Sequence, residues 1–179
     1  QPEHKVRIVN GWRAKGCITA MTGDGVNDAP SIKNADIGVG MGITGTDVTK
    51  NAADMVLADD NFATIVSAVG EGRRIYDNIR KSIQFLLSSN LSEVLSIFFA
   101  TLLGFVILKP VHLLWINLIT DCFPALARGM EEPEKDVMNR PPRSPKEGIF
   151  AGGVGFHVAV QGIAVTVITL ASYLIGHYL

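Results

Sequence analysis

The chain has little charge and few cysteines for its 179 residues. Charged residues make up 18% of it, against about 25% in an average soluble protein, while 47% of the residues are apolar. The high apolar content excludes an intrinsically disordered chain. The net charge of −1 excludes a basic nucleic-acid-binding protein, so we expect no nucleic-acid partner. Two cysteines, Cys17 and Cys122, are too few for a disulfide scaffold, and both are interpreted as free thiols.

The scarcity of charge is confined to the second half of the chain. Residues 1–81 contain ten acidic and ten basic residues, as a soluble domain would, and the first ten residues lack the apolar run of a signal peptide. Three later segments are almost uncharged: residues 83–108 with only Glu93, residues 111–127 with only Asp121, and residues 149–179 with no Asp, Glu, Lys or Arg. Because a membrane-spanning helix needs about 20 apolar residues, the sequence predicts three spans, of which the second is marginal in length.

Basic residues flank the first two predicted spans. They precede the first span at positions 73–81 and follow the second at positions 128–146, with only residues 108–110 between the two spans. The positive-inside rule assigns both basic flanks to the cytoplasm, so these spans would form a hairpin and the third would cross outward again. The Pro-rich, charged residues 130–148 are predicted to form a cytoplasmic connection and not a helix.

The first part of the chain has the pattern of an open α/β sheet. Residues 15–25 predict a buried strand that runs into a Gly-rich turn, Pro30 lies in the first turn of a short helix, and residues 35–42 and 52–60 predict two further strands. We therefore predict an α/β domain with an open parallel sheet.

A long helical pattern follows the predicted sheet. It begins at Phe62 and meets no proline before Pro110. Residues 73–103 would extend about 46 Å as a helix, which exceeds the bilayer core of about 30 Å. The sequence therefore predicts an all-α membrane region whose first helix begins outside the membrane as a stalk.

The motif TGDGVNDAP, at residues 22–30, carries two carboxylates around a Gly-rich turn. Asp24 follows a predicted strand, and Asp28 comes four residues later beside Asn27. Ligands of open α/β sheets bind at the carboxyl ends of strands, and paired carboxylates suit Mg²⁺ together with a phosphate. The alternative is that these residues only cap the helix that follows. Spacing leaves both interpretations open.

Polar residues inside the first two predicted spans form a second candidate site. The five are Asn90, Glu93, Asn117, Thr120 and Asp121. Their spacing places the first two on one helix face and the last three on another. A carboxylate inside a membrane is costly and points to function, and a cluster of oxygens suits Ca²⁺. Interhelical hydrogen bonding and a proton relay are the alternatives. Pro124 is expected to break the second helix and free main-chain carbonyls for a cation.

Six motifs in a fixed order suggest a family. They are TGDGVNDAP, MVLADDNF, EGRRIYDNIRK, SSNLSE, WINLITD and NRPPRSPKE. This order closely resembles the type II P-type ATPases, and within them the calcium-transporting branch of the sarcoplasmic-reticulum kind. The resemblance covers nearly the whole chain and thins after about residue 150. It implies a multi-pass membrane protein, which we expect in the plasma membrane of a bacterium with the first domain in the cytoplasm.

The resemblance also implies roles for individual residues. Asp24 would help to hold the cofactor Mg²⁺ in a phosphorylation domain of haloacid-dehalogenase-like fold, supported by Asn27 and Asp28. Lys5 matches the family lysine that neutralises phosphoryl charge. The five intramembrane residues match ligands of transported Ca²⁺. In the family, the γ-phosphate of ATP is transferred to an aspartate, and the aspartyl phosphate is then hydrolysed.

The family's domain order can be transferred to this chain. It implies the end of the phosphorylation domain at 1–70, a stalk at 71–82, the fifth and sixth membrane helices at 83–108 and 111–129, a cytoplasmic loop at 130–148 and the seventh helix at 149–179. The DKTGT motif with the phosphorylated aspartate is not in the sequence. We therefore expect a part of a pump that is inactive alone and whose partners are the lipid bilayer, Ca²⁺ and the other pump domains.

Two residues depart from the family pattern. Cys122 stands where a smaller residue is expected, and Arg128 follows Asp121 by seven residues, so that it either reaches the ion site or faces the cytoplasm. Alternatives to a Ca²⁺ pump are a pump for Mn²⁺, Na⁺, K⁺ or H⁺, a membrane-anchored phosphatase-like domain, and a non-catalytic remnant.

Overall fold

The computed structural model describes residues 2–144 and 146–178, and these form two compact units that divide between Val69 and Gly70. Residues 1 and 179, at the ends of the first and last predicted segments, lie outside the described residues. Within the described chain, three helical stretches are long and apolar enough to cross a membrane: Phe62–Leu102, Pro110–Gly129 and Val154–His177. Each of the three predicted spans thus corresponds to a helical stretch that meets this requirement.

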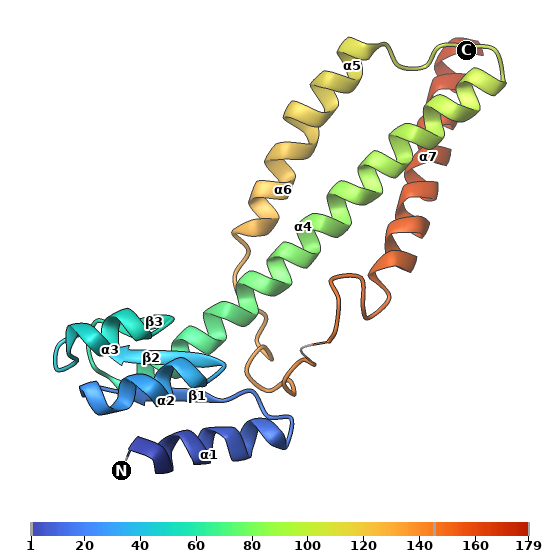
Figure 1. Ribbon diagram of the computed structural model, residues 1–179. Helices are drawn as coiled ribbons and strands as arrows, with labels where there is room; N and C mark the ends of the chain where they lie inside the picture. The colour runs from blue at the N-terminus through green and yellow to red at the C-terminus, as the bar shows by residue number, and fades with distance from the viewer. Residues whose placement is uncertain (1, 145, 179) are drawn as a thin grey trace. The chain divides into compact units, whose positions relative to one another are not determined.

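The first unit is built on a small parallel sheet (Figure 1). Its strands are β1 (Ala20–Gly23), β2 (Ile37–Met41) and β3 (Met55–Leu57), paired in the order β1-β2-β3. All three predicted strands and the parallel sheet are confirmed. After the short 3₁₀ helix η1 (Val26–Asp28), helix α2 (Ala29–Asn34) begins as predicted.

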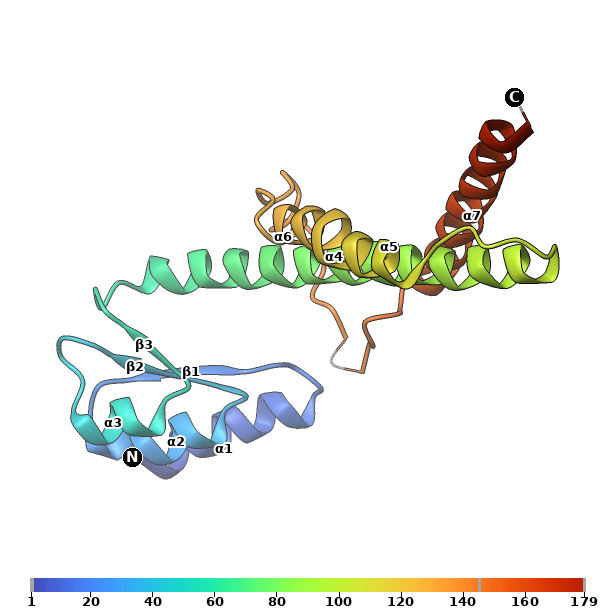
Figure 2. The same ribbon diagram turned by 90° about the horizontal axis from the view of Figure 1, so that it is seen from above.

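Two helices of the first unit were not predicted from the sequence. Helix α1 (Pro2–Ala14) packs against α2, and α3 (Asp47–Ala52) lies with α2 on one face of the sheet (Figure 2). Thr46 caps α3 by accepting a hydrogen bond from the main-chain N–H of Thr49, which is the local signal that could have revealed this helix.

Glycine in β2 lets the helices approach the sheet closely. A Cβ atom at Gly38 would lie 2.7 Å from Ile32 Cγ2, and one at Gly40 would lie 3.3 Å from the Ala53 Cβ. Ile32 and Val39 are fully buried between these layers. The core of the unit therefore depends on the absence of side chains at two positions of its central strand.

The second unit consists of helices joined by irregular segments. It contains most of α4 (Phe62–Leu102), then α5 (Pro110–Trp115), the π-helix η2 (Ile116–Asp121), α6 (Cys122–Gly129) and α7 (Val154–Tyr178). No helix forms in the described part of residues 130–148, as predicted. The third span begins later than the predicted residue 149, because Gly152 and Gly153 have φ of 67° and 84°, which a right-handed helix excludes.

The prediction that Pro124 breaks the second span is wrong. The helix continues through Pro124 to the end of α6 at Gly129. Proline cannot donate to the carbonyl four residues earlier and clashes with it, and here that carbonyl belongs to Thr120. The π-helical turn η2 (Ile116–Asp121) lies immediately before, so the chain accommodates the proline by widening the helix and not by ending it.

Side chains of α4 fix the segment between α6 and α7. Asn78 is buried and donates its side-chain amide to the carbonyls of Gly129 and Glu131. Arg140 donates to Asp77 at 2.7 Å and also binds Glu134. Hydrogen bonds from Lys81 and Arg140 lower the pKa of the Glu134 carboxyl. These contacts supply partners that a segment without regular structure would otherwise lack.

Small residues allow α4 and α7 to pack closely. Ser88, Ser92, Ser96 and Ala100 recur every four residues on α4 and are buried, and Thr166 of α7 donates to the carbonyl of Ser92.

We predict that Gly162→Ala destabilises this helix pair. Its Cβ would lie 2.8–3.1 Å from three side-chain atoms of Leu91, including the Leu91 Cβ, so a rotamer change cannot clear them. The cost should be about 1–3 kcal/mol, the usual range for overpacking. Gly155→Ala on the same helix, with nothing within 4 Å, is the control. Equal unfolding temperatures of the two variants in detergent would contradict this packing.

Candidate functional site

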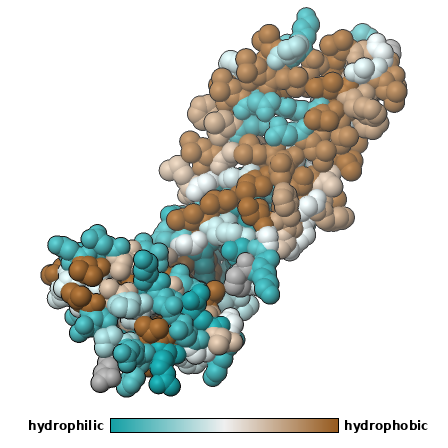
Figure 3. Space-filling view, in the orientation of Figure 1, coloured by the Kyte–Doolittle hydropathy of each residue, from teal (hydrophilic) through white to brown (hydrophobic). Residues whose placement is uncertain are grey.

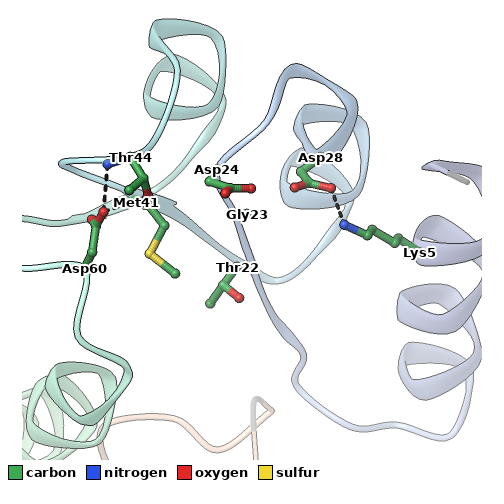
Figure 4. A pocket seen from close by; sticks show the side chains of 8 residues that line it. All are labelled: Lys5, Thr22, Gly23, Asp24, Asp28, Met41, Thr44 and Asp60. Carbon is green, nitrogen blue, oxygen red and sulfur yellow. Dashed lines mark hydrogen bonds and ion pairs between the residues drawn. The ribbon is translucent and has the colours of Figure 1, made fainter.

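A cavity of about 430 Å³ lies in the first unit, at the carboxyl ends of β1 and β2. Residues from α1, β1, β2, η1 and the loops after the three strands line it (Figure 4): Lys5, Thr22, Gly23, Asp24, Asp28, Met41, Thr44 and Asp60. The carboxyl end of a parallel sheet is where ligands of α/β proteins bind. Three of the four residues predicted for phosphate chemistry, Lys5, Asp24 and Asp28, therefore meet at one cavity.

Asp28 pairs with Lys5 across the cavity wall. Lys5 Nζ lies 2.5 Å from the Asp28 carboxylate, which is buried. Burial raises the pKa of Asp28, but the hydrogen bond and the charge of Lys5, with hydrogen bonds from the main chain of Gly25 and Asp24, lower it below its ordinary value. The side chain of Asp28 makes no capping hydrogen bond to α2. The alternative that Asp28 only caps this helix is thus not what the structure shows.

Asp24 is exposed, lines the cavity and makes no side-chain hydrogen bond within the described residues. Its main chain is held instead, because its carbonyl accepts from the Thr46 N–H at 2.9 Å and from Thr49 Oγ1 at 3.2 Å. Gly23 permits the close turn, since a Cβ there would lie 2.4 Å from the Asp28 Cβ. Asn27 is exposed and is not among the residues that line the cavity.

The donor set at Asp24 is compatible with Mg²⁺. No group of three or more His, Cys, Asp or Glu side chains within the described residues could hold a metal ion. Mg²⁺, however, is usually held by one or two carboxylates, with phosphate oxygens and water completing its shell. An exposed carboxylate with open acceptor positions, in the cavity that Asp28 and Lys5 also line, fits a site of this kind.

Asp60 is a cavity residue that the sequence reasoning missed. Its carboxylate accepts hydrogen bonds from the main-chain N–H groups of Gly42, Ile43 and Thr44 at 2.6, 3.0 and 2.7 Å, and from Thr44 Oγ1 at 2.8 Å. Burial raises the pKa of Asp60, but these bonds outweigh it and lower the pKa to about 2. The sequence did offer a signal for Asp60, because it follows β3 as Asp24 follows β1, and ligands of open α/β sheets bind at the carboxyl ends of strands.

The candidate intramembrane site lies in the second unit, whose helices have a largely apolar surface (Figure 3). The amide of Asn117 donates to the two carboxylate oxygens of Glu93 at 3.0 and 3.3 Å, which links η2 to α4. Asp121, at the end of η2, is 3% exposed, and its Oδ2 is buried without a hydrogen-bond partner within the described residues.

The other two predicted ion ligands make no side-chain hydrogen bonds in the described part of the chain. Asn90 and Thr120 are exposed, and their side chains make no hydrogen bond within the described residues.

Arg128 packs its guanidinium over the ring of Phe85 at 5.6 Å. Phe85 precedes Glu93 by eight residues, about two helical turns along α4. The structure therefore gives Arg128 an aromatic partner away from Glu93.

Comparison with known proteins identifies the family. Residues 105–179 match the family described as cation transporting ATPase, C-terminus. The chain is 56% identical to the calcium-transporting ATPase of Bacillus subtilis (99% of this chain, 20% of the relative), 57% to calcium-transporting ATPase 1 of Bacillus cereus (98% and 20%) and 51% to calcium-transporting ATPase 4, endoplasmic reticulum-type, of Arabidopsis thaliana (99% and 17%).

The chain belongs to the P-type cation-transporting ATPases, as its motifs implied. Within that family its similarity is to calcium-transporting members from bacteria and from a plant. It spans about one fifth of the length of these relatives. With three helices able to cross a membrane, it is a multi-pass membrane protein.

We predict that the stability of the Lys5→Met variant falls less between neutral and acid pH than that of the wild type. Because the pKa of Asp28 is lowered in the folded protein, its ionisation stabilises the fold at neutral pH, and this contribution is lost as the pH falls through the lowered pKa. Without Lys5 the pKa of Asp28 rises. Thermal unfolding followed from about pH 6 to about pH 2 should show lower stability of the variant near neutrality and a smaller loss in acid.

The matched control for this prediction is Lys15→Met. Lys15 stacks on the ring of Trp12 and forms no ion pair within the described residues. Its substitution should leave the acid limb of the stability curve unchanged. An identical acid limb in Lys5→Met and wild type would show that the Lys5–Asp28 pair does not contribute to stability.

Proposed function

We propose that this chain is part of an ATP-driven Ca²⁺ pump that works through an aspartyl phosphate intermediate. The observation that carries the proposal is the buried carboxylate of Asp121, inside a stretch able to cross a membrane and with one oxygen lacking a hydrogen-bond partner. Removing such a group from water costs several kcal/mol unless a positive partner is supplied. A bound cation supplies that partner.

The surroundings of Asp121 support a cation site. Glu93 is bound by the neutral amide of Asn117, and neither carboxylate forms an ion pair with a described lysine or arginine. Two carboxylates are thus left in apolar helices without compensating charge. A π-helical turn ends at Asp121, and such turns are frequent at functional sites. Interhelical hydrogen bonding accounts for the contact of Glu93 with Asn117, but within the described residues it gives Asp121 Oδ2 no partner.

Oxygen ligands together with the similarity to calcium-transporting relatives favour Ca²⁺ as the cation. The five candidate ligands, which are Asn90, Glu93, Asn117, Thr120 and Asp121, offer only oxygen atoms as acceptors, and Ca²⁺ takes six to eight oxygens. The curated relatives are named calcium-transporting ATPases. The same oxygens could serve Mn²⁺ or a monovalent cation, and the first experiment below separates these.

In the first unit, the cavity supports phosphoryl chemistry in a haloacid-dehalogenase-like domain. Lys5 would bring positive charge to the phosphoryl oxygens, Asp28 would hold Lys5 in place, and Asp24 would hold Mg²⁺. Bound Mg²⁺ would neutralise negative charge on the phosphoryl group as it is transferred. The phosphorylated aspartate and the ATP site would come from other domains of the complete pump.

The proposed topology follows from the basic flanks. The first unit would lie in the cytoplasm, and the helices would cross the plasma membrane of a bacterium. A membrane-anchored phosphatase without transport is the second candidate, but it leaves the carboxylates of Glu93 and Asp121 without a role.

We predict that the complete protein in membranes accepts labelled γ-phosphate from ATP only when Ca²⁺ is added. Ca²⁺, Mn²⁺ and Na⁺ would be tested singly over a Mg²⁺ background, because occupation of the cation site is expected to permit phosphorylation. If label appeared only with Mn²⁺ or only with Na⁺, that cation and not Ca²⁺ would be assigned as the transported ion. No label with any ion, in protein shown to be folded, would refute the pump. The isolated 179-residue chain should take up no label.

Two isosteric variants should separate the cation site from the phosphoryl site. Asp121→Asn removes the buried charge, so at least about 10-fold more Ca²⁺ should be needed for phosphorylation by ATP, while phosphorylation by inorganic phosphate survives. Asp24→Asn should reduce phosphorylation from either source at least about 100-fold. Each variant serves as the control for the other. A normal Ca²⁺ response of Asp121→Asn would exclude Asp121 from the cation site.

A further inference from the structure

We propose that Asp60 is a positioning residue of the phosphoryl site, which holds the loop after β2 so that Asp24 is fixed at the cavity. The inference rests on the function proposed above and assigns a role to a residue outside the predicted site. Asp60 follows β3, lines the same cavity as Lys5 and Asp24, and faces the loop at Thr44 (Figure 4).

Every acceptor position of the Asp60 carboxylate is used by the loop. Oδ1 accepts from the N–H groups of Gly42 and Ile43, and Oδ2 accepts from the N–H and the hydroxyl of Thr44. An ionised carboxylate has about four acceptor sites. Four donors at 2.6–3.0 Å leave no position for a metal ion or a substrate. Asp60 can therefore act only through the loop.

The loop that Asp60 holds leads directly to the main chain of Asp24. It runs from Gly42 into the N-cap of α3 at Thr46, whose N–H donates to the Asp24 carbonyl at 2.9 Å, and Thr49 Oγ1 donates to the same carbonyl. Within the described residues the Asp24 side chain has no hydrogen bond of its own. The position of its carboxylate thus depends on these main-chain contacts.

The backbone of this region is built for one tight conformation. A Cβ at Gly42 would lie 2.4 Å from the carbonyl oxygen of Leu57, and one at Gly45 would lie 1.9 Å from that of Met41. Asp60 has φ of 49°, a conformation that side-chain-bearing residues rarely adopt. The loop therefore has little freedom to move while Asp60 is bound to it, and much more once the carboxylate is removed.

The first measurement is hydrogen exchange in the Mg²⁺-free complete protein. Asp60→Asn loses acceptor capacity at one end of the side chain, and Asp60→Ala loses all four bonds. Exchange of residues 42–49 should be faster in both variants, more so in Asp60→Ala, while exchange in α2 stays as in wild type and shows that the domain is folded. Wild-type exchange of residues 42–49 in both variants would overturn the inference.

The second measurement is the Mg²⁺ dependence of phosphorylation by inorganic phosphate. A displaced Asp24 should raise the half-saturating Mg²⁺ concentration about 10-fold in Asp60→Ala and less in Asp60→Asn, with little change in the maximal level. A merely structural role would lower the maximal level, because less enzyme is folded, without moving the half-saturation point. That result would overturn the positioning role.

The matched control is Asp59→Asn. Asp59 accepts from Thr64 Oγ1 and from the Asn61 N–H and does not line the cavity. Its half-saturation point should equal that of wild type, and a shift as large as that of Asp60→Ala would overturn the inference. Absence of phosphorylated wild-type protein would instead refute the proposed function, so the two failures are distinct.

Discussion

An ionised carboxylate that leaves water must find positive charge or hydrogen-bond donors, and this requirement shapes both units of the protein. In the first unit it is met internally, by Lys5 for Asp28 and by three main-chain N–H groups and a hydroxyl for Asp60. In the second unit it is not, since Asp121 keeps an oxygen without a partner. The difference separates acids whose partners lie within the fold from an acid with an oxygen left for the proposed cation.

The backbone accommodates close packing and missing hydrogen bonds in different ways in the two units. In the first unit, glycine at positions such as Gly23 and Gly38 brings chain segments to distances that no side chain would allow. In the second unit, a π-helical turn before Pro124 keeps the span helical where proline removes a hydrogen bond. Side chains of α4 such as Asn78 satisfy the carbonyls of the irregular segment after α6.

Most of the architecture was predictable because its signals are local. Three strands, the helix from Phe62 and three long apolar helical stretches follow from patterns within short windows, and each was confirmed. The six-residue helix α3 is shorter than the window in which periodicity can be detected, and α1 buries only Val9. The break expected at Pro124 was wrong, because the sequence shows the missing donor but not the wider turn that accommodates it.

For the two candidate sites as well, local features were predictable from the sequence and contacts between distant residues were not. Hydropathy, turn-forming glycines and motif order depend on neighbouring residues, so the linear chain was enough to predict three apolar helices and the family, and to single out Asp24 and Asp121 as candidate site residues. The pairing of Lys5 with Asp28 and the clamp of Asp60 on the loop after β2 join groups 16–23 residues apart. The solitary burial of Asp121 likewise depends on which helices surround it. Such relations were settled only by packing, because a residue's partners and its access to water depend on distances in three dimensions that no local pattern encodes.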